Sequence, residues 1–235
     1  MTSVALAETL NKMERRFFFE RRTGRASRTD YIGGNTWRGW RASPKIEDAV
    51  VRALVAAFDV FVARFQDFYK QNGPVTRKVF DAFHAGEVEF LFEFTKKHHR
   101  AAQVHPASAG DCHGYAYNSY AKVLNLIYTH WFFRLVPNSR PPKVNYAATD
   151  YPDLVFCCHV PLDTQIHTGL RDFISRGLIQ KPSVEMPNAG MGSVRSKEHY
   201  YALQEYLRSI ADSIQSSNFP GRPVSPLAFE AFWEG

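Results

Sequence analysis

Between residues 115 and 135 the sequence predicts a helix with apolar side chains on almost every face. Two faces can be distinguished, one made by Leu124, Ile127, Tyr128 and Trp131, the other by Leu126 and Phe133. A helix that is apolar nearly all round is stable only when other elements cover it. The chain is therefore expected to fold around this helix, and its partners must be sought elsewhere in the sequence.

Helical spacing of apolar residues predicts those partners. Ser43-Pro44 has the form of an N-cap followed by the first helical residue, and a helix is expected from there to Lys70, before Asn72-Gly73-Pro74. Further helices are expected over 8–22, 75–84, 87–101, 163–176 and 197–215, and from Pro226 to Trp233. Gly86 is expected to break the second and third of these apart. Because no segment alternates like a good strand, the predicted fold class is all-α.

The chain of 235 residues is long enough for one large domain or two small ones. We expect a basic, aromatic N-terminal segment over 1–42 and a helical domain over 43–235, which could form two lobes with a cleft between them. Residues 136–158 are rich in proline and lack a clear period, so they are expected to be an irregular insertion.

The formal net charge of +6 favours a polyanionic partner, with nucleic acid first, although a merely basic protein would have the same charge. No apolar run is long enough for a membrane helix, and the first residues do not resemble a secretion signal. Three cysteines suit a reducing cytoplasm and are too few for an all-cysteine iron–sulfur site. We expect a cytoplasmic monomer without a cofactor.

Two polar residues with apolar neighbours are the candidate chemical groups. Lys122 lies within the predicted central helix, and Asp163 follows Pro161-Leu162 at the start of the next one. A desolvated amine can act as a nucleophile, and a carboxylate beside it can move a proton or stabilise positive charge. The alternatives are a lysine that reaches the helix edge and an aspartate that only caps its helix.

The segment Leu162-Asp163-Thr164-Gln165-Ile166 resembles the Val-Asp-Thr-His-Val/Ile segment of the helix-hairpin-helix DNA glycosylase superfamily. The segment 120–126, Tyr-Ala-Lys-Val-Leu-Asn-Leu, resembles the start of the helix that carries the catalytic lysine in bifunctional members. The resemblance implies a two-lobed helical bundle, with Lys122 and Asp163 as catalytic residues.

The sequence departs from the superfamily pattern in three ways. Gly114-Tyr115-Ala116-Tyr117-Asn118-Ser119 stands where a Leu-Pro-Gly-Val-Gly hairpin is usual, the lysine and aspartate are 41 residues apart, and a cysteine cluster is absent. The first two departures favour a divergent branch that resembles the archaeal 8-oxoguanine DNA glycosylases.

The activity implied by the resemblance is excision of a modified base. The nucleotide is flipped out of the duplex, Lys122 attacks the anomeric carbon and Asp163 assists. Oxidised guanine and a hypermodified phage base are both candidate substrates, so both DNA repair and anti-phage defence are open as roles. If Lys122 instead positions a water molecule, the product is an abasic site without a strand break.

Several other residues are candidates for contact with DNA. Trp37, Arg38 and Trp40 lie in a loop rich in glycine and arginine, where they suit base stacking and phosphate contact. Backbone N–H groups near Ser119 could hold a phosphate at a helix start, and Pro161 fixes the chain beside Asp163. Tyr115, Tyr117 and Trp233 are candidate stacking residues. Aromatic residues of this kind belong more often to the core than to a pocket, so the core is the alternative for each of them.

Two other functions fit parts of the sequence. A nucleic-acid-binding module without catalysis would need neither Lys122 nor Asp163. A metal-dependent nuclease could draw on His98, His99, His105, Asp111 and His113, although their spacing matches no metal-binding motif. The histidines on either side of Asp163, His159 and His167, are expected to be structural residues with satisfied hydrogen bonds.

Overall fold

The computed structural model describes residues 4–17, 60–96, 117–132, 153–187, 193–194 and 196–234. Its elements are α1 (Val4–Arg15), a helical segment over 60–72, α4 (Arg77–Lys96), α5 (Tyr117–Phe132), α6 (Leu154–Cys157), α7 (Thr164–Ser175), α8 (Lys197–Asp212) and the 3-10 helix η6 (Pro226–Glu234). No strand forms among the described residues, where only an isolated bridge joins Gln215 to Pro223. The predicted all-α class is confirmed.

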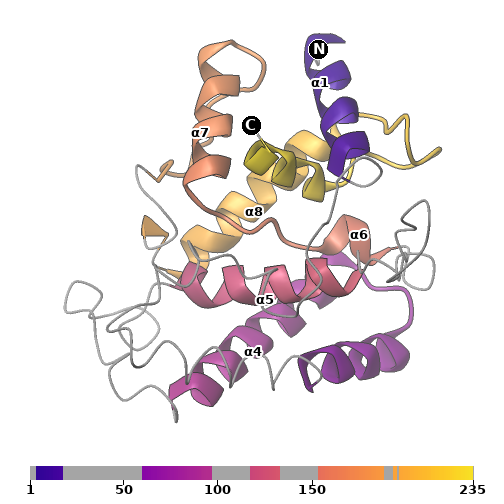
Figure 1. The fold of residues 1–235 in the computed structure, drawn as a ribbon, viewed down its shortest axis with the longest axis vertical. Helices are drawn as coiled ribbons and strands as arrows, with labels where there is room; N and C mark the ends of the chain where they lie inside the picture. The colour runs from indigo at the N-terminus through magenta and orange to yellow at the C-terminus, as the bar shows by residue number, and fades with distance from the viewer. Residues whose placement is uncertain are drawn as a thin grey trace.

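The helices form two groups with α8 between them (Figure 1). In this view α4, α5 and the segment 60–72 lie below, while α1, α7 and η6 lie above. The helix α5 packs on α4 and α8, and η6 packs on α1, α6, α7 and α8. The segment that links α6 to α7 passes between the two groups (Figure 1).

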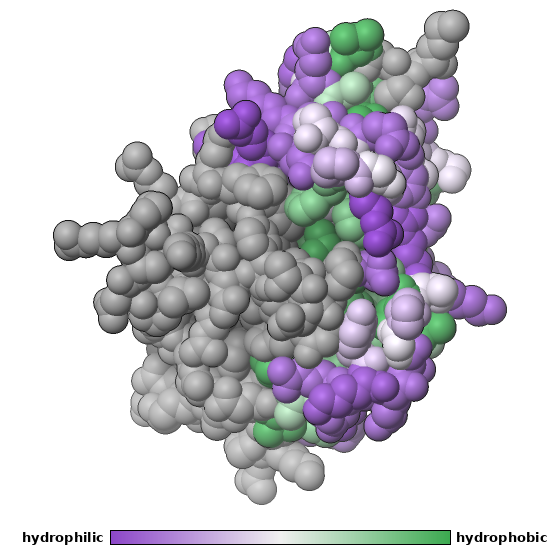
Figure 2. All heavy atoms as spheres, turned by 90° about the vertical axis from the view of Figure 1, so that its right-hand side faces the viewer, coloured by the Kyte–Doolittle hydropathy of each residue, from purple (hydrophilic) through white to green (hydrophobic). Residues whose placement is uncertain are grey.

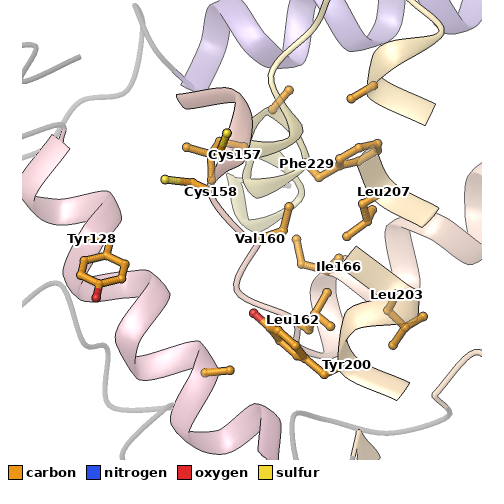
Figure 3. Packing of buried hydrophobic residues seen from close by; sticks show 14 of the residues in the cluster. Tyr128, Cys157, Cys158, Val160, Leu162, Ile166, Tyr200, Leu203, Leu207 and Phe229 are labelled. Carbon is orange, nitrogen blue, oxygen red and sulfur yellow. The ribbon is translucent and has the colours of Figure 1, made fainter. Parts of the chain in front are cut away.

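The helix α5 is buried as its apolar sequence predicts. Every residue from 117 to 128 is buried, including Lys122 and the two asparagines of the helix. Figure 3 shows Tyr128 on this helix and Val160 and Leu162 on the α6–α7 segment, with side chains of α8 beside them. The central position of α5 therefore brings Asn118, Ser119, Lys122 and Asn125 into the core along with its apolar side chains.

The prediction of two helices separated at Gly86 is wrong. The helix α4 continues from Arg77 to Lys96, and Gly86 lies within it on the exposed side. A glycine in a helix costs only about 1 kcal/mol relative to alanine. Burial of neighbouring residues on the other side, such as Val88 and Leu91, outweighs this cost.

The ends of the chain also differ from expectation. The first helix begins at Val4 rather than near residue 8, and Leu6, Leu10 and Phe17 join the same core as the rest of the protein. The predicted irregular insertion ends in the short helix α6, which is buried on most of its residues. The predicted boundary near residue 42 lies outside the described residues.

Glu14 holds α1 to the C-terminal part of the chain. Its carboxylate is fully buried and accepts hydrogen bonds from the backbone N–H of Ser225 at 2.7 Å, from Asn218 Nδ2 at 3.0 Å and from the Ser216 hydroxyl. A buried carboxylate needs such donors to offset the loss of water. Residues more than 200 positions apart are thereby joined.

The described surface is largely hydrophilic in the view of Figure 2, with smaller hydrophobic areas. The large hydrophobic side chains that the described residues expose are Val4, Val60 and Val79. None of the described helices is long and apolar enough to cross a bilayer.

Candidate active site

Lys122 and Asp163 lie together. Lys122 Nζ donates a hydrogen bond to Asp163 Oδ2 at 2.9 Å, and the two side chains are 4% and 13% exposed. The lysine comes from the second turn of α5, and the aspartate precedes the first residue of α7. The two residues that the sequence selects separately thus form one largely buried ion pair.

Asp163 is also the N-cap of α7. Its backbone is extended, with φ −155° and ψ −172°, and Oδ1 accepts hydrogen bonds from the N–H groups of Gln165 at 2.9 Å and Ile166 at 3.2 Å. These bonds satisfy donors that every helix start leaves open. The two oxygens therefore have separate tasks, since Oδ1 fixes the carboxylate on the helix and Oδ2 faces the lysine.

Lys122 is the middle member of a buried polar row on α5. Asn118 lies one turn before it and Asn125 one turn after it, so the three side chains share a face. Asn118 Nδ2 donates to the carbonyl oxygen of Leu162 at 3.0 Å, and Asn125 Nδ2 donates to that of Val160 at 3.4 Å. The row therefore holds the α6–α7 segment at three points along its length.

The same segment is held from the other side by α8. Gln204 Oε1 accepts from the Val160 N–H at 2.9 Å, and Gln204 Nε2 donates to the Val160 carbonyl at 2.8 Å. Val160 and Gln204 are both buried. Bonding from two helices leaves the chain leading to Asp163 little freedom, so the position of the carboxylate is fixed before any ligand binds.

A ring of polar side chains, most of them buried, lies beside this segment. His159 bonds Asp81 at 2.8 Å and Tyr200 at 3.1 Å, Tyr200 accepts from Asn125 at 2.8 Å, and Asn125 bonds His84 at 2.9 Å. His84 then bonds Tyr201, which donates to the Asp81 carbonyl. The ring connects α4, α5 and α8. It includes Asn125, which also belongs to the polar row on α5.

The ring fixes which nitrogen of His159 carries the proton. The Asp81 carboxylate can only accept, so His159 Nε2 carries the proton that it donates to Asp81 Oδ1. His159 Nδ1 is then the acceptor of a hydrogen bond from the Tyr200 hydroxyl, which itself accepts from Asn125 Nδ2. Burial lowers the pKa of His159 to about 4, so it stays neutral at neutral pH.

Asp81 is the negatively charged member of this ring. Burial would raise its pKa, but hydrogen bonds from His159 and Arg208 outweigh burial and hold the pKa well below its usual value. Arg208 binds both carboxylate oxygens, at 2.9 and 2.8 Å. Arg208 also donates to the Cys157 carbonyl at the end of α6, at 2.6 Å. This bidentate ion pair therefore holds the chain that leads from α6 to α7, and it does not contact Lys122 or Asp163.

His167 departs from the prediction that it is a satisfied structural residue. It lies one turn after Asp163 on α7 and is fully buried, yet neither ring nitrogen has a hydrogen-bond partner among the described residues. His159, by contrast, has partners on both nitrogens, as predicted. An unsatisfied pair of buried nitrogens carries no signal in the sequence, because it depends on what the fold places around the ring.

The remaining predicted contacts with DNA fall in two groups. Tyr117 is 1% exposed and Ser119 and Pro161 are buried, so in this structure all three belong to the core. Tyr117 contacts Tyr201 through their hydroxyl groups, at 3.3 Å. Trp37, Arg38, Trp40 and Tyr115 lie outside the described residues, as does the side chain of Trp233. Stacking on Tyr117 would require α5 to separate from α8.

The described residues form no group of three or more histidines, cysteines, aspartates or glutamates that could hold a metal ion. The predicted cluster from His98 to His113 lies outside them. The fold and the site together define an all-helical protein with a buried lysine–aspartate pair at a helix start. No family model, curated protein or solved structure matches the chain.

Proposed function

We propose that the chain is a DNA N-glycosylase in which Lys122 attacks the sugar of an extruded nucleotide and Asp163 assists. The observation that carries this proposal is the 2.9 Å contact between Lys122 Nζ and Asp163 Oδ2. It joins, across 41 residues of chain, the lysine and the aspartate that the resemblance to helix-hairpin-helix DNA glycosylases selects. The two-lobed bundle of that superfamily is part of the proposal.

The pair has the groups that base excision needs. Transfer of a proton from Lys122 to Asp163 along their hydrogen bond gives a neutral amine, whose lone pair attacks C1′ of the sugar. The C1′–N bond to the base breaks, and the base leaves with its electron pair and takes up the proton that Asp163 received from Lys122. The substituted amine then loses a proton to Asp163, and its lone pair breaks the C1′–O4′ bond. O4′ takes up that proton, which leaves a protonated Schiff base. Loss of a C2′ proton and cleavage of the C3′–O bond would nick the strand.

The surroundings of the pair favour this chemistry. Because Lys122 is 4% exposed, its interactions with charge on the sugar are screened little by water. The cap bonds to Oδ1 hold the Asp163 carboxylate in place, so little reorganisation is needed when positive charge develops nearby. The buried position of both groups also requires the nucleotide to leave the duplex.

The partner in this proposal is DNA, bound by a cytoplasmic monomer whose formal net charge is +6. Oxidised guanine and a hypermodified phage base are the two substrate classes. They correspond to DNA repair and to anti-phage defence.

A non-catalytic nucleic-acid-binding module is the second candidate. It is favoured by the fact that both oxygens of Asp163 are already engaged, Oδ1 by the helix start and Oδ2 by Lys122. Such a carboxylate could serve only to hold α7 against α5. In that case the pair would matter for stability and not for any reaction.

Borohydride trapping on DNA tests the proposal. Duplexes that contain 8-oxoguanine, 5-hydroxymethylcytosine or an abasic site are incubated with the protein and reduced. We expect a covalent adduct on at least one duplex, which is lost in Lys122→Met and retained in Lys181→Met, a change at an exposed lysine. Asp163→Asn, which keeps the cap acceptor, should slow adduct formation by at least about tenfold.

Two other outcomes would decide against a lysine nucleophile. Base release without an adduct would assign Lys122 to the positioning of water. Absence of both adduct and base release, with DNA affinity unchanged in Asp163→Asn, would favour the binding module.

A further inference from the structure

His167 is placed where it could take part in the chemistry of Lys122 and Asp163. It follows Asp163 by four residues on α7, so the two side chains lie on the same side of the helix. Asp163 and Lys122 are both among the charged groups that act on its ring. The imidazole therefore lies within electrostatic reach of the ion pair.

The ring is unsatisfied in the free protein. In the part of the chain that the structure describes, neither Nδ1 nor Nε2 has a hydrogen-bond partner, although both atoms are shielded from solvent. Buried polar atoms nearly always have partners, because leaving one unpaired is destabilising. A phenylalanine or leucine would fill this position without that cost. The protein therefore keeps an unfavourable group at this position, as functional sites often do.

The other buried histidines show that this is specific to His167. His84 bonds Tyr201 through Nδ1 and Asn125 through Nε2, and His159 bonds Tyr200 and Asp81. The fold thus satisfies the imidazoles of α4 and of the α6–α7 segment, but not the one on α7. General burial of histidine does not explain the difference.

The His167 ring is neutral at neutral pH. Burial lowers its pKa to about 4; Asp163 opposes this change, while Arg171, His199 and Lys122 add to it. A neutral imidazole has one N–H donor and one bare nitrogen acceptor. Phosphate would need a cation, whereas an uncharged ligand edge with both a donor and an acceptor matches this ring.

We propose that His167 recognises the base of the extruded nucleotide, using its two unpartnered ring nitrogens to hydrogen-bond the donor and acceptor groups of that base. This rests on the proposed glycosylase function, since it gives the same site a residue that selects its substrate. Because both nitrogens are shielded in the free protein, the base reaches them only when the side chains that cover them move. The base supplies the hydrogen bonds that the free protein lacks.

Stability is the first test, and it does not depend on any activity. His167→Phe keeps a similar ring and removes the unsatisfied nitrogens, so Tm should rise by about 2 to 4 °C. His84→Phe is the matched control, because its nitrogens are bonded and their loss should lower Tm. A fall in Tm of His167→Phe as large as that of His84→Phe would mean that the ring is satisfied in solution, and would overturn the proposal.

Activity separates recognition of the base from attack on the sugar. On the modified duplex that the wild type processes best, His167→Phe should lower kcat/KM for base release at least about tenfold, which is about 1.4 kcal/mol. Borohydride trapping on an abasic duplex, which has no base to recognise, should be unchanged. An equal loss of activity on both duplexes would mean that His167 only supports the site in general. No loss of activity on either duplex would show that His167 does not recognise the base.

A binding readout keeps this inference distinct from the proposed function. Nitrogen NMR of the histidine rings is recorded with 8-oxo-2′-deoxyguanosine and with 5-hydroxymethyl-2′-deoxycytidine at millimolar concentration. A shift of the His167 signals, with those of His84 unchanged, supports recognition of a base even if no duplex is cleaved. If neither nucleoside nor a processed duplex moves the His167 signals, the proposal fails, whatever the activity of Lys122.

Discussion

Gln204 binds both polar groups of the Val160 peptide, accepting from its N–H at 2.9 Å and donating to its carbonyl at 2.8 Å. One side-chain amide on α8 thus replaces the neighbouring strand or helical turn that would normally satisfy this backbone. The chain can stay extended inside the core only while that amide is present, because buried backbone groups must be paired.

Removal of the amide should therefore be costly. Gln204→Leu leaves the N–H of Val160 without its partner and weakens the bonding of its carbonyl, so we expect a loss of about 2 to 4 kcal/mol in the free energy of unfolding. Urea denaturation measures it. Gln165→Ala, at an exposed glutamine on α7, should change stability by less than about 0.5 kcal/mol. Equal effects of the two variants would contradict the role given to Gln204.

The buried ion pair predicts strong non-additivity. Asp163→Ser keeps a helix cap but leaves the Lys122 ammonium without this carboxylate, which should cost about 3 to 5 kcal/mol. Lys122→Met together with Asp163→Ser should recover most of that loss, because an apolar side chain then fills the buried position. Unfolding free energies of the two single variants and the double variant give the coupling. Additive losses would show that the two side chains act independently.

Stability should fall on mild acidification. The pKa values of His159 and His167 are lowered in the folded protein from 6.5 to about 4, so the unfolded chain takes up protons first as the pH falls. Folding free energy is therefore lost between pH 6.5 and about pH 4, by up to about 1.4 kcal/mol per pH unit for each histidine. His167→Phe removes one of the two histidines, so the slope of unfolding free energy against pH should decrease by up to about 1.4 kcal/mol per pH unit. Parallel curves for the variant and the wild type would contradict the burial of this ring.

Two helical glycines should respond to alanine in opposite directions. A Cβ at Gly86 meets nothing, so Gly86→Ala should stabilise the protein by up to about 1 kcal/mol through helix propensity. A Cβ at Gly169 would overlap the ring of Phe232 on η6, so Gly169→Ala should cost about 1 to 3 kcal/mol. Thermal unfolding of the two variants measures both changes in stability. A stabilising Gly169→Ala would show that Phe232 moves aside easily.

Loss of the Glu14 carboxylate should loosen both ends of the described chain. Glu14→Ala removes the acceptor of three donors from residues 216–225, and we expect a loss of about 2 to 4 kcal/mol. Limited proteolysis should then release α1 first. Glu8→Ala, at an exposed glutamate on the same helix, is the control and should leave the pattern of cleavage unchanged.

Much of this arrangement could be predicted from the sequence. Periodicity and capping residues placed α5, α7 and α8 close to their observed bounds, and the apolar surroundings of Lys122 together with the motif at Asp163 selected the pair that meets. Helical spacing works for such elements because burial of one face decides their fold.

The rest depends on contacts that spacing does not encode. Asn118, Asn125 and Gln204 are ordinary polar residues in sequence, and their role appears only when α5 and α8 enclose the segment before α7. The continuity of α4 through Gly86 likewise follows from packing on neighbouring residues, which outweighs local propensity. Whether the ring nitrogens of His167 find hydrogen-bond partners depends only on the groups that the fold places around the ring.

The bonds from Glu14 to residues 216–225 also have a consequence for the order of assembly. During synthesis α1 leaves the ribosome more than 200 residues before these bonding partners of Glu14. The apolar side of α1, with Leu6 and Leu10, therefore stays uncovered by them while those residues are made. During that interval the nascent chain should bind chaperones at α1.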